Sequence, residues 1–161
     1  MIEQSNIQIL DIEKTVIHEG FDETTGVNDI ALIKTVGEFT FTDLVISLCM
    51  NIDRSIIHQA ANGTMSGITN EESKVLQADR VTIMKQTSYN VCRHPGVFCT
   101  GPNTGLKSMA SGASLAMCFN GKCALAGLHS TRSAAFSPDY TKFYSFTNIV
   151  YYLPWIYKNG K

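Results

Sequence analysis

The feature that most constrains this chain is its pattern of short apolar runs between turn-forming residues. Stretches rich in β-branched and other apolar side chains alternate with Gly, Asn, Ser and Thr clusters, at residues 7–17, 30–33, 45–48, 81–84, 115–117 and 124–128. Runs this short predict β-strands. A helical pattern appears only at residues 149–158, where Pro154 is expected to kink the helix or to mark the first turn of a shorter one. The pattern therefore predicts an all-β barrel or sandwich followed by a helix.

Length and charge narrow the class of protein. A chain of 161 residues makes one domain or two small ones. Thirteen basic against 14 acidic residues give a net charge of −1, which argues against nucleic acid or a membrane surface as a partner. The apolar runs are far shorter than the roughly 20 residues of a membrane span. Acidic residues interrupt the first twenty positions, so this segment does not resemble a signal peptide.

Two of the five cysteines flank a predicted hairpin. Asn120-Gly121 between two apolar runs is a strong signal for a two-residue turn. In such a hairpin Cys118 faces Cys123, with Cβ atoms about 4.5–5.5 Å apart. A disulfide needs about 3.5–4.5 Å, so a cross-strand bridge is possible with slight closure.

The other cysteines leave more room for interpretation. Cys92 and Cys99 stand seven apart around Pro95-Gly96, a spacing that suits a loop closed by a bridge. Five reduced thiols in a cytosolic protein are the alternative. We expect no metal site, because neither pair has zinc-finger spacing and His94 lacks a second matching histidine. We favour an oxidising compartment, with Cys49 left over as a thiol.

Asn62-Gly63-Thr64 matches the acceptor triplet for N-glycosylation. Such triplets are common by chance, and a polar turn is the simpler interpretation of this one.

Several segments, in order, resemble the chymotrypsin/trypsin family of serine proteases. V-I-H-E-G-F-D at residues 16–22 precedes N-D-I-A-L-I-K at 28–34, the most specific of the matches. F-T-D-L-V-I-S-L-C follows at 41–49, and F-C-T-G stands at 98–101. Ser66-Gly67 matches a family S-G-W-G segment that here lacks its Trp-Gly, and L-P-W-I at 153–156 matches the closing helix. The resemblance covers nearly the whole chain.

The resemblance implies a fold of two antiparallel β-barrels with a C-terminal helix. Residues 1–48 would form only part of the first barrel, residues 49–62 would link the barrels, and residues 63–161 would hold a complete second barrel and the helix. It also implies the Cys92–Cys99 bridge, and places the usual partner of Cys49 upstream of the present chain. We expect residues 1–48 to pack less well than the rest, or to pair with another chain.

The catalytic triad of the family would be incomplete. Asp29 stands at the position of the triad acid. A histidine should lie upstream in an A-A-H-C segment, but the upstream histidine here is His18, in a stretch that matches a surface strand end. We therefore read His18 as structural or solvated and expect no general base in this chain.

The nucleophile position is altered as well. An ungapped alignment from Cys118 places Gly112, which has no hydroxyl, at the nucleophile, and Ser111 at the aspartate that supports the oxyanion hole. A rival alignment, shifted by one residue, places Ser111 at the nucleophile and Ala110 at that aspartate. Both remove the supporting carboxylate, and a serine without an adjacent base is a poor nucleophile.

The substrate pocket would also differ. Leu106 stands at the base of the pocket, where trypsin-like members carry an aspartate. The substrate-binding strand reads Ser130-Thr131-Arg132, with Arg132 in place of a small glycine. Ordinary packing of Leu106 and a solvated charge at Arg132 are the alternative interpretation.

These features favour an inactive homologue that binds a protein partner, such as a protease, an inhibitor or another ligand, as a decoy or regulator. The resemblance implies secretion, and no cofactor is expected. One alternative is a fragment or isoform of an active endopeptidase whose histidine lies upstream of Met1. Another is a small cytosolic β-protein with an incidental resemblance.

Overall fold

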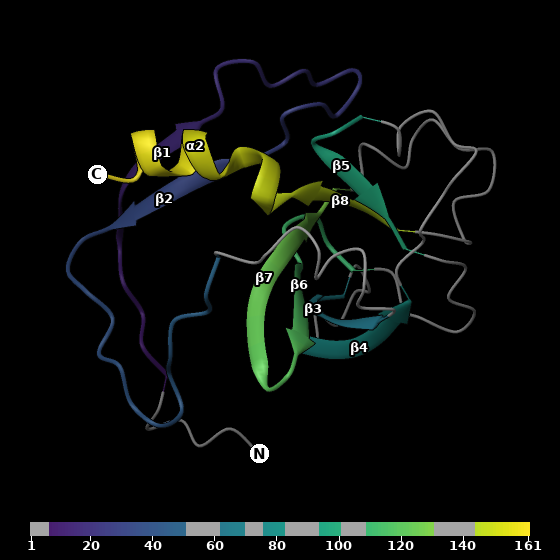
Figure 1. Cartoon of the computed structure of the whole chain (residues 1–161). Helices are drawn as coiled ribbons and strands as arrows, with labels where there is room; N and C mark the ends of the chain where they lie inside the picture. The colour runs from purple at the N-terminus through teal and green to yellow at the C-terminus, as the bar shows by residue number, and fades with distance from the viewer. Residues whose placement is uncertain (1–6, 51–61, 70–75, 83–93, 101–108, 131–143) are drawn as a thin grey trace.

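The computed structural model describes residues 7–50, 62–69, 76–82, 94–100, 109–130 and 144–161. These residues form a two-stranded ribbon, a six-stranded antiparallel sheet and one helix, α2 (Figure 1). The mainly-β fold with a C-terminal helix confirms the predicted class. In the described part of the chain no helix is long and apolar enough to cross a membrane.

The ribbon pairs β1 (Ile12–Ile17) with β2 (Ala31–Thr35) in antiparallel register, with Val16 opposite Leu32. Its strands are the β-branched runs that the sequence pattern predicts. Five of the six β1 residues are exposed, because β1 pairs only with β2 among the described strands. Lys34 Nζ lies 2.8 Å from Glu13 Oε1 across the ribbon.

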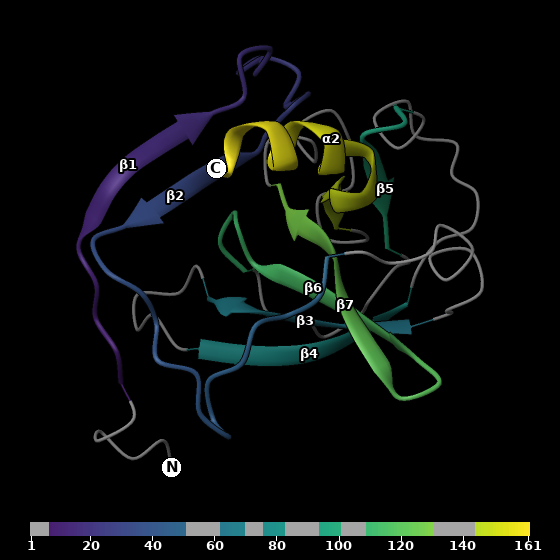
Figure 2. The ribbon, with the colours of Figure 1, turned by 60° about the vertical axis from the view of Figure 1, so that its left-hand side comes forward.

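The larger sheet has the strand order β4-β3-β6-β7-β8-β5. Its strands are β3 (Asn62–Ile68), β4 (Leu76–Thr82), β5 (Val97–Cys99), β6 (Ser114–Phe119), β7 (Lys122–His129) and β8 (Ser145–Asn148). Figure 2 shows the sheet turning from the nearly level β3 and β4 to the upright β5. The predicted Asn120-Gly121 turn joins β6 to β7, with both residues at positive φ, 50° and 76°.

The core lies on the inner face of this sheet. Met65, Leu115, Met117 and Phe146 are all at most 1 % exposed. Gly127 permits the close approach of strands there, because a Cβ at this position would lie 2.8 Å from Phe146 Cβ and 2.8 Å from the Phe98 ring.

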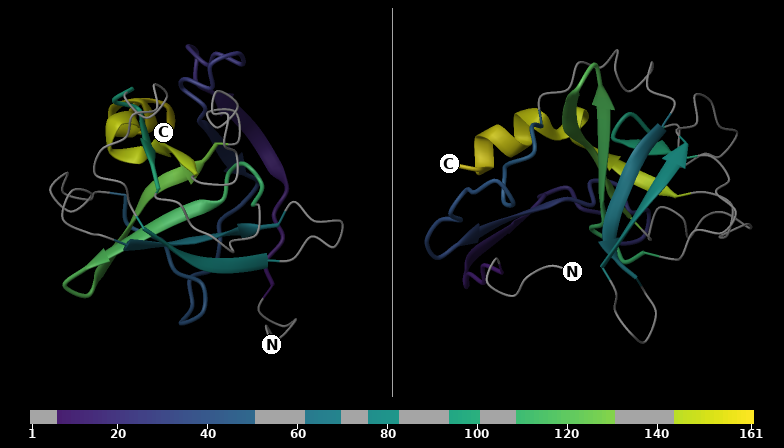
Figure 3. Two further views of the ribbon diagram at one scale, coloured as in Figure 1. Left: turned by 90° about the vertical axis from the view of Figure 1, so that its right-hand side faces the viewer. Right: turned by 90° about the horizontal axis from the view of Figure 1, so that it is seen from below.

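Helix α2 (Ile149–Asn159) begins at Asn148, whose side-chain oxygen accepts a hydrogen bond from the Val150 amide. The helix runs through Pro154, which therefore neither ends it nor marks its first turn. In the right-hand view of Figure 3, α2 and the ribbon lie on the same side of the molecule, opposite β3 and β4. Ile30, Tyr152, Trp155 and Ile156 form a second buried cluster, which joins the helix to the first part of the chain.

Two expectations are wrong. The apolar run at 45–48 is not a strand: Leu44 and Ile46 are 73 % and 78 % exposed, and regular pairing is limited to an isolated Thr42–Val45 bridge. With nothing to cover them among the described residues, the apolar side chains lack the packing that makes a strand. Asn62-Gly63-Thr64 is not a turn, because it opens β3, where it pairs with β4. The predicted linker at 49–62 lies mostly outside the described residues.

Candidate functional site

The first and second halves of the chain meet at Asp29, just before β2. Ser130 Oγ donates a hydrogen bond to Asp29 Oδ2 at 2.7 Å, and Thr147 Oγ1 donates to the Asp29 carbonyl at 2.8 Å. Ser130 lies directly after β7 and Thr147 lies in β8. Asp29 is therefore held at its carboxylate by Ser130, after β7, and at its backbone carbonyl by Thr147, in β8.

The turn before Asp29 is shaped by Asn28, which adopts a φ of 58°. Its amide nitrogen donates to the Gly20 carbonyl at 2.7 Å, and its amide oxygen accepts from the Tyr152 hydroxyl at 2.9 Å. Asparagine tolerates this left-handed conformation better than most residues. Burial raises the pKa of Tyr152 to about 12, so its hydroxyl stays protonated and donates to Asn28.

Ser130 is 1 % exposed and fixed by its neighbours. Its amide donates to the Ser145 carbonyl at 3.0 Å, and Ser145 Oγ donates to the Ser130 carbonyl at 2.8 Å. The structure thus brings two predicted site residues, Asp29 and Ser130, into contact. The other pocket residues of the prediction, Leu106, Thr131 and Arg132, lie outside the described residues.

Ser111 and Gly112 form an exposed turn before β6. The Gly112 amide donates to the His129 carbonyl at 2.8 Å, and the Ala113 amide donates to the Ala110 carbonyl at 3.2 Å. Gly112 has a φ of 89°, while a Cβ built on it would meet nothing within 4 Å. Backbone conformation, and not space, is what favours glycine at this position.

His129, at the end of β7, was not singled out by the sequence reasoning. It is 5 % exposed, with its ring centroid 5.1 Å from that of Tyr144 and 5.7 Å from that of Phe146. Among the described residues its Nδ1 has no hydrogen-bond partner. Burial lowers the pKa of His129 to about 4, so the imidazole is neutral near pH 7. The sequence signal that could have found it is a histidine directly after the apolar run 124–128.

His129 and Ser130 are consecutive residues at the end of a strand, where side chains alternate between faces. The His129 ring packs on Phe146, whereas Ser130 reaches Asp29. The imidazole of His129 is therefore directed away from the Asp29 carboxylate.

His18 has a packing role, which agrees with the expectation that it is structural or solvated. Its Nδ1 accepts a hydrogen bond from the Gly20 amide at 3.1 Å, and its ring lies 4.9 Å from that of Trp155. Next to it, Trp155 Nε1 donates to Glu19 at 2.7 Å. Hydrogen bonds from the Glu19 backbone amide and from Trp155 lower the pKa of the Glu19 carboxyl. This pair of residues anchors α2 to the turn after β1.

The hydrogen bonds of Asp29 thus lead to Ser130 and Thr147. Among the described histidines, His18 and His94 accept hydrogen bonds from backbone amides, and the His129 ring packs on Phe146. The family model described as Trypsin matches residues 2–156. The chain belongs to the trypsin family.

A curated relative agrees with this assignment. Trypsin-1 of Astacus astacus is 27 % identical over 173 residues, covering 99 % of this chain and 71 % of the relative. The extent of the family match excludes an incidental resemblance. The roles of Asp29 as triad acid and of Ser130 in a substrate-binding strand stay predictions, and the structure adds that the two side chains are in contact.

The predicted Cys118–Cys123 disulfide is confirmed, and the Cys92–Cys99 pairing stays a prediction. Cys118 and Cys123 are paired in register across β6 and β7 and form a disulfide. Cys99 is also disulfide-bonded, while its predicted partner Cys92 lies outside the described residues. Cys49 is not in a disulfide, and its carbonyl accepts a hydrogen bond from the Leu125 amide at 2.7 Å.

Proposed function

We propose that this trypsin-family domain does not hydrolyse peptides and acts by binding a protein partner. The observation that carries the proposal is the surroundings of Asp29. Its carboxylate accepts from Ser130, while His18, His94 and His129 are each committed to other contacts. Triad chemistry needs an imidazole between the carboxylate and the nucleophile, to take the hydroxyl proton and return it to the leaving amine.

The nucleophile turn supports the same proposal. A serine at position 112 would have to adopt a φ near 89°, which is strained for a residue with a side chain. The conformation therefore favours the alignment that places Ser111, and not position 112, at the nucleophile. Ser111 is exposed and has Ala110, not an acid, before it. A serine hydroxyl is an effective nucleophile at neutral pH only when a general base takes its proton.

The test is hydrolysis of a mixed peptide library, followed by mass spectrometry. The full chain is compared with Ser111→Ala and with His58→Ala, since His58 lies outside the described residues. We expect the three proteins to give the same product yield as buffer. Cleavage that disappears in Ser111→Ala would overturn the proposal, because loss of an active triad serine costs about 10⁶-fold in rate.

The first part of the chain supports partner binding. Large apolar side chains stand exposed there, among them Ile9 at 88 %, Ile12 at 62 %, Phe41 at 66 %, Leu44 at 73 % and Ile46 at 78 %. Soluble monomers rarely expose apolar patches of more than a few hundred Å². Exposed apolar side chains concentrated between residues 7 and 48 fit a surface that another polypeptide covers.

The ribbon gives this surface a shape. Val16 and Leu32, which face each other, pack toward α2. Ile17 and Ile33 lie on the opposite face and are both 61 % exposed. The outer edge of β1 is open among the described strands, and an open edge can pair with a strand of another chain. We infer a partner that adds an extended segment with apolar side chains.

A matched pair of variants tests this surface. The double variant Ile17→Lys/Ile33→Lys places charges on the outer face of the ribbon, and Ile68→Lys places one on β3, where Ile68 is 48 % exposed. With the dye anilinonaphthalene sulfonate, we expect fluorescence to fall by more than half in the double variant and little in the control. Dye binding that is absent in the unmodified chain would contradict an available apolar surface.

One observation favours a second candidate, an active endopeptidase of which this chain is one part. Asp29 is held by Ser130 as a carboxylate that could orient a histidine from elsewhere. Transcript sequencing upstream of Met1 tests it: an in-frame segment with a histidine, and hydrolysis by the longer product, would support this candidate. Hydrolysis by that product would contradict the first proposal, that the domain does not hydrolyse peptides.

A further inference from the structure

The acceptor triplet Asn62-Gly63-Thr64 is the only Asn-x-Ser/Thr triplet in the 161 residues. It opens β3, and the alternation of a strand divides its side chains between two faces. Gly63 and Met65 lie on the inner face and are buried, whereas Asn62 is half-buried and Thr64 is exposed. The two residues that an N-glycosylation signal requires therefore share the outer face.

Core packing accounts for the glycine in the middle. A Cβ on Gly63 would lie 2.8 Å from Leu115 Cδ1 and 3.0 Å from the Ala116 carbonyl oxygen. Packing in the core makes no such demand on Asn62 or Thr64, whose side chains leave the sheet on the other side. Asn62 and Thr64 therefore present their side chains on the outer face.

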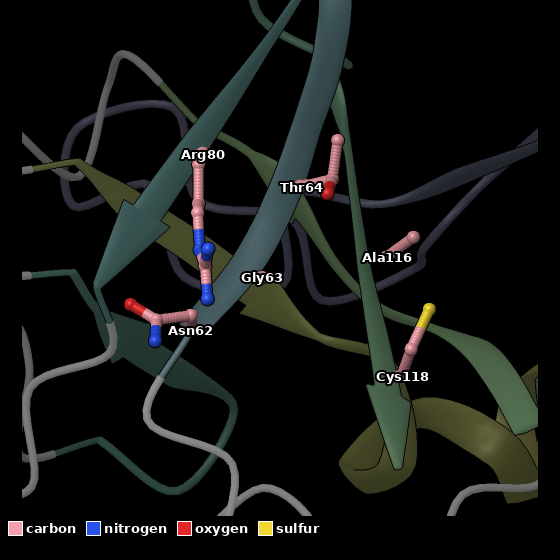
Figure 4. Close-up of a pocket in the computed structure, with 6 residues that line it drawn as sticks. All are labelled: Asn62, Gly63, Thr64, Arg80, Ala116 and Cys118. Atoms are coloured by element: carbon pink, nitrogen blue, oxygen red, sulfur yellow. The ribbon is translucent and has the colours of Figure 1, made fainter. Parts of the chain in front are cut away.

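A hollow lies on that face, beside Asn62. The register places Thr64 between Arg80 on β4 and Ala116 on β6, with Cys118 two residues further along β6. These residues line a hollow of about 260 Å³. Figure 4 shows the Arg80 side chain extending along the sheet toward Asn62. Its lining offers guanidinium N–H donors, a hydroxyl and an apolar patch beside the Cys118–Cys123 disulfide.

We propose that Asn62 carries an N-linked glycan whose first sugar lies in this hollow. The donor is a lipid-pyrophosphate-linked oligosaccharide of the secretory pathway. The Asn62 amide nitrogen forms a bond to the anomeric carbon, the bond from that carbon to the pyrophosphate oxygen breaks, and the amide loses a proton. The lipid pyrophosphate is the leaving group, and no oxidant or reductant is needed.

The hollow suits the first sugar chemically. Hydroxyl and acetamido oxygens of the sugar can accept hydrogen bonds from Arg80, and the Thr64 hydroxyl can donate or accept. The C–H face of the ring can lie over Ala116. The Cys118–Cys123 disulfide is typical of the same oxidising route on which glycosylation takes place. The inference rests on that route and not on the proposed lack of catalysis.

The first test is site occupancy. The full chain is secreted from a eukaryotic host behind a cleavable leader, and its peptides are mapped by mass spectrometry. We expect a hexosamine-linked Asn62, lost in Asn62→Gln and Thr64→Ala and retained in Thr64→Ser, which keeps the required hydroxyl. An unmodified Asn62 in secreted protein whose Cys118–Cys123 bridge has formed would overturn the proposal.

The second test concerns the hollow. Endoglycosidase trimming leaves one sugar on Asn62, and the comparison is the same chain from bacterial periplasm, which carries none. We expect the one-sugar form to melt roughly 2–4 °C higher. In Arg80→Ala that difference should shrink by at least half. Equal melting temperatures of the two forms would show that the sugar does not occupy the hollow.

Discussion

Substitution of Ser130 by alanine tests how the two halves of the chain are joined. The change removes the hydrogen bond from Ser130 Oγ to Asp29 Oδ2, at 2.7 Å, between residues 101 positions apart. A hydrogen bond to a charged group contributes about 1.5–3 kcal/mol. Ser130 is 1 % exposed, so the lost hydroxyl is not readily replaced by bulk water. We expect Ser130→Ala to lower the free energy of unfolding by that amount.

Urea unfolding followed by circular dichroism measures this loss, and a thermal scan should show a fall of roughly 3–12 °C. Ser114→Ala is a matched control, because Ser114 Oγ makes only a neutral 3.3 Å bond to the Ser66 carbonyl. We expect the control to cost less than about 1 kcal/mol. A double-mutant cycle of Ser130→Ala with Asp29→Ala, in which each change removes the hydrogen bond, should give a coupling of about 1 kcal/mol or more. A coupling near zero would refute the joining role of this contact.

Three further predictions concern stability. Burial lowers the pKa of His129 to about 4, from 6.5 in the unfolded chain, so the stability that the neutral imidazole contributes is full above pH 6.5 and is lost as the pH falls from 6.5 to 4. The free energy of unfolding should drop by roughly 3 kcal/mol over that window. His129→Leu should flatten the pH profile of stability measured by urea titration. The double variant Cys118→Ser/Cys123→Ser opens a short loop and should cost about 2 kcal/mol. Cys49→Ser removes no disulfide and should lower the melting temperature much less, as measured by calorimetry. Gly127→Ala forces a Cβ to within 2.8 Å of Phe146 and Phe98, and should destabilise by about 1–3 kcal/mol in urea; a variant as stable as the parent would mean that these rings move aside.

Local patterns in the sequence predicted much of the fold. The β-branched runs became β1 and β2, Asn120-Gly121 became the β6–β7 turn, and the last apolar segment became α2. The predicted strand at 45–48 was wrong. An apolar run indicates that its side chains need to be buried, but it does not indicate which part of the chain would bury them. β3 was missed because Gly63 and polar residues hide a strand whose inner face depends on a single large side chain, Met65.

Only part of the candidate site could be predicted from the sequence. The family resemblance assigned Asp29 and Ser130 separate roles, and no local pattern reports the contact between these residues, which stand 101 positions apart. Thr147 gave no signal, since one threonine in a polar stretch resembles many others. The positive φ of Gly112, which bears on the two alignments at the nucleophile, depends on the turn conformation and not on the residue type alone.

Reaction of Ser111 with a fluorophosphonate tests the central proposal most directly. The probe attaches covalently only to a serine that a base activates, so the intact mass of the 17.7 kDa chain reports the chemistry without a choice of substrate. We predict an unchanged mass after incubation, equal to that of Ser111→Ala. A mass increase of one probe in the parent chain, absent from Ser111→Ala, would contradict the account.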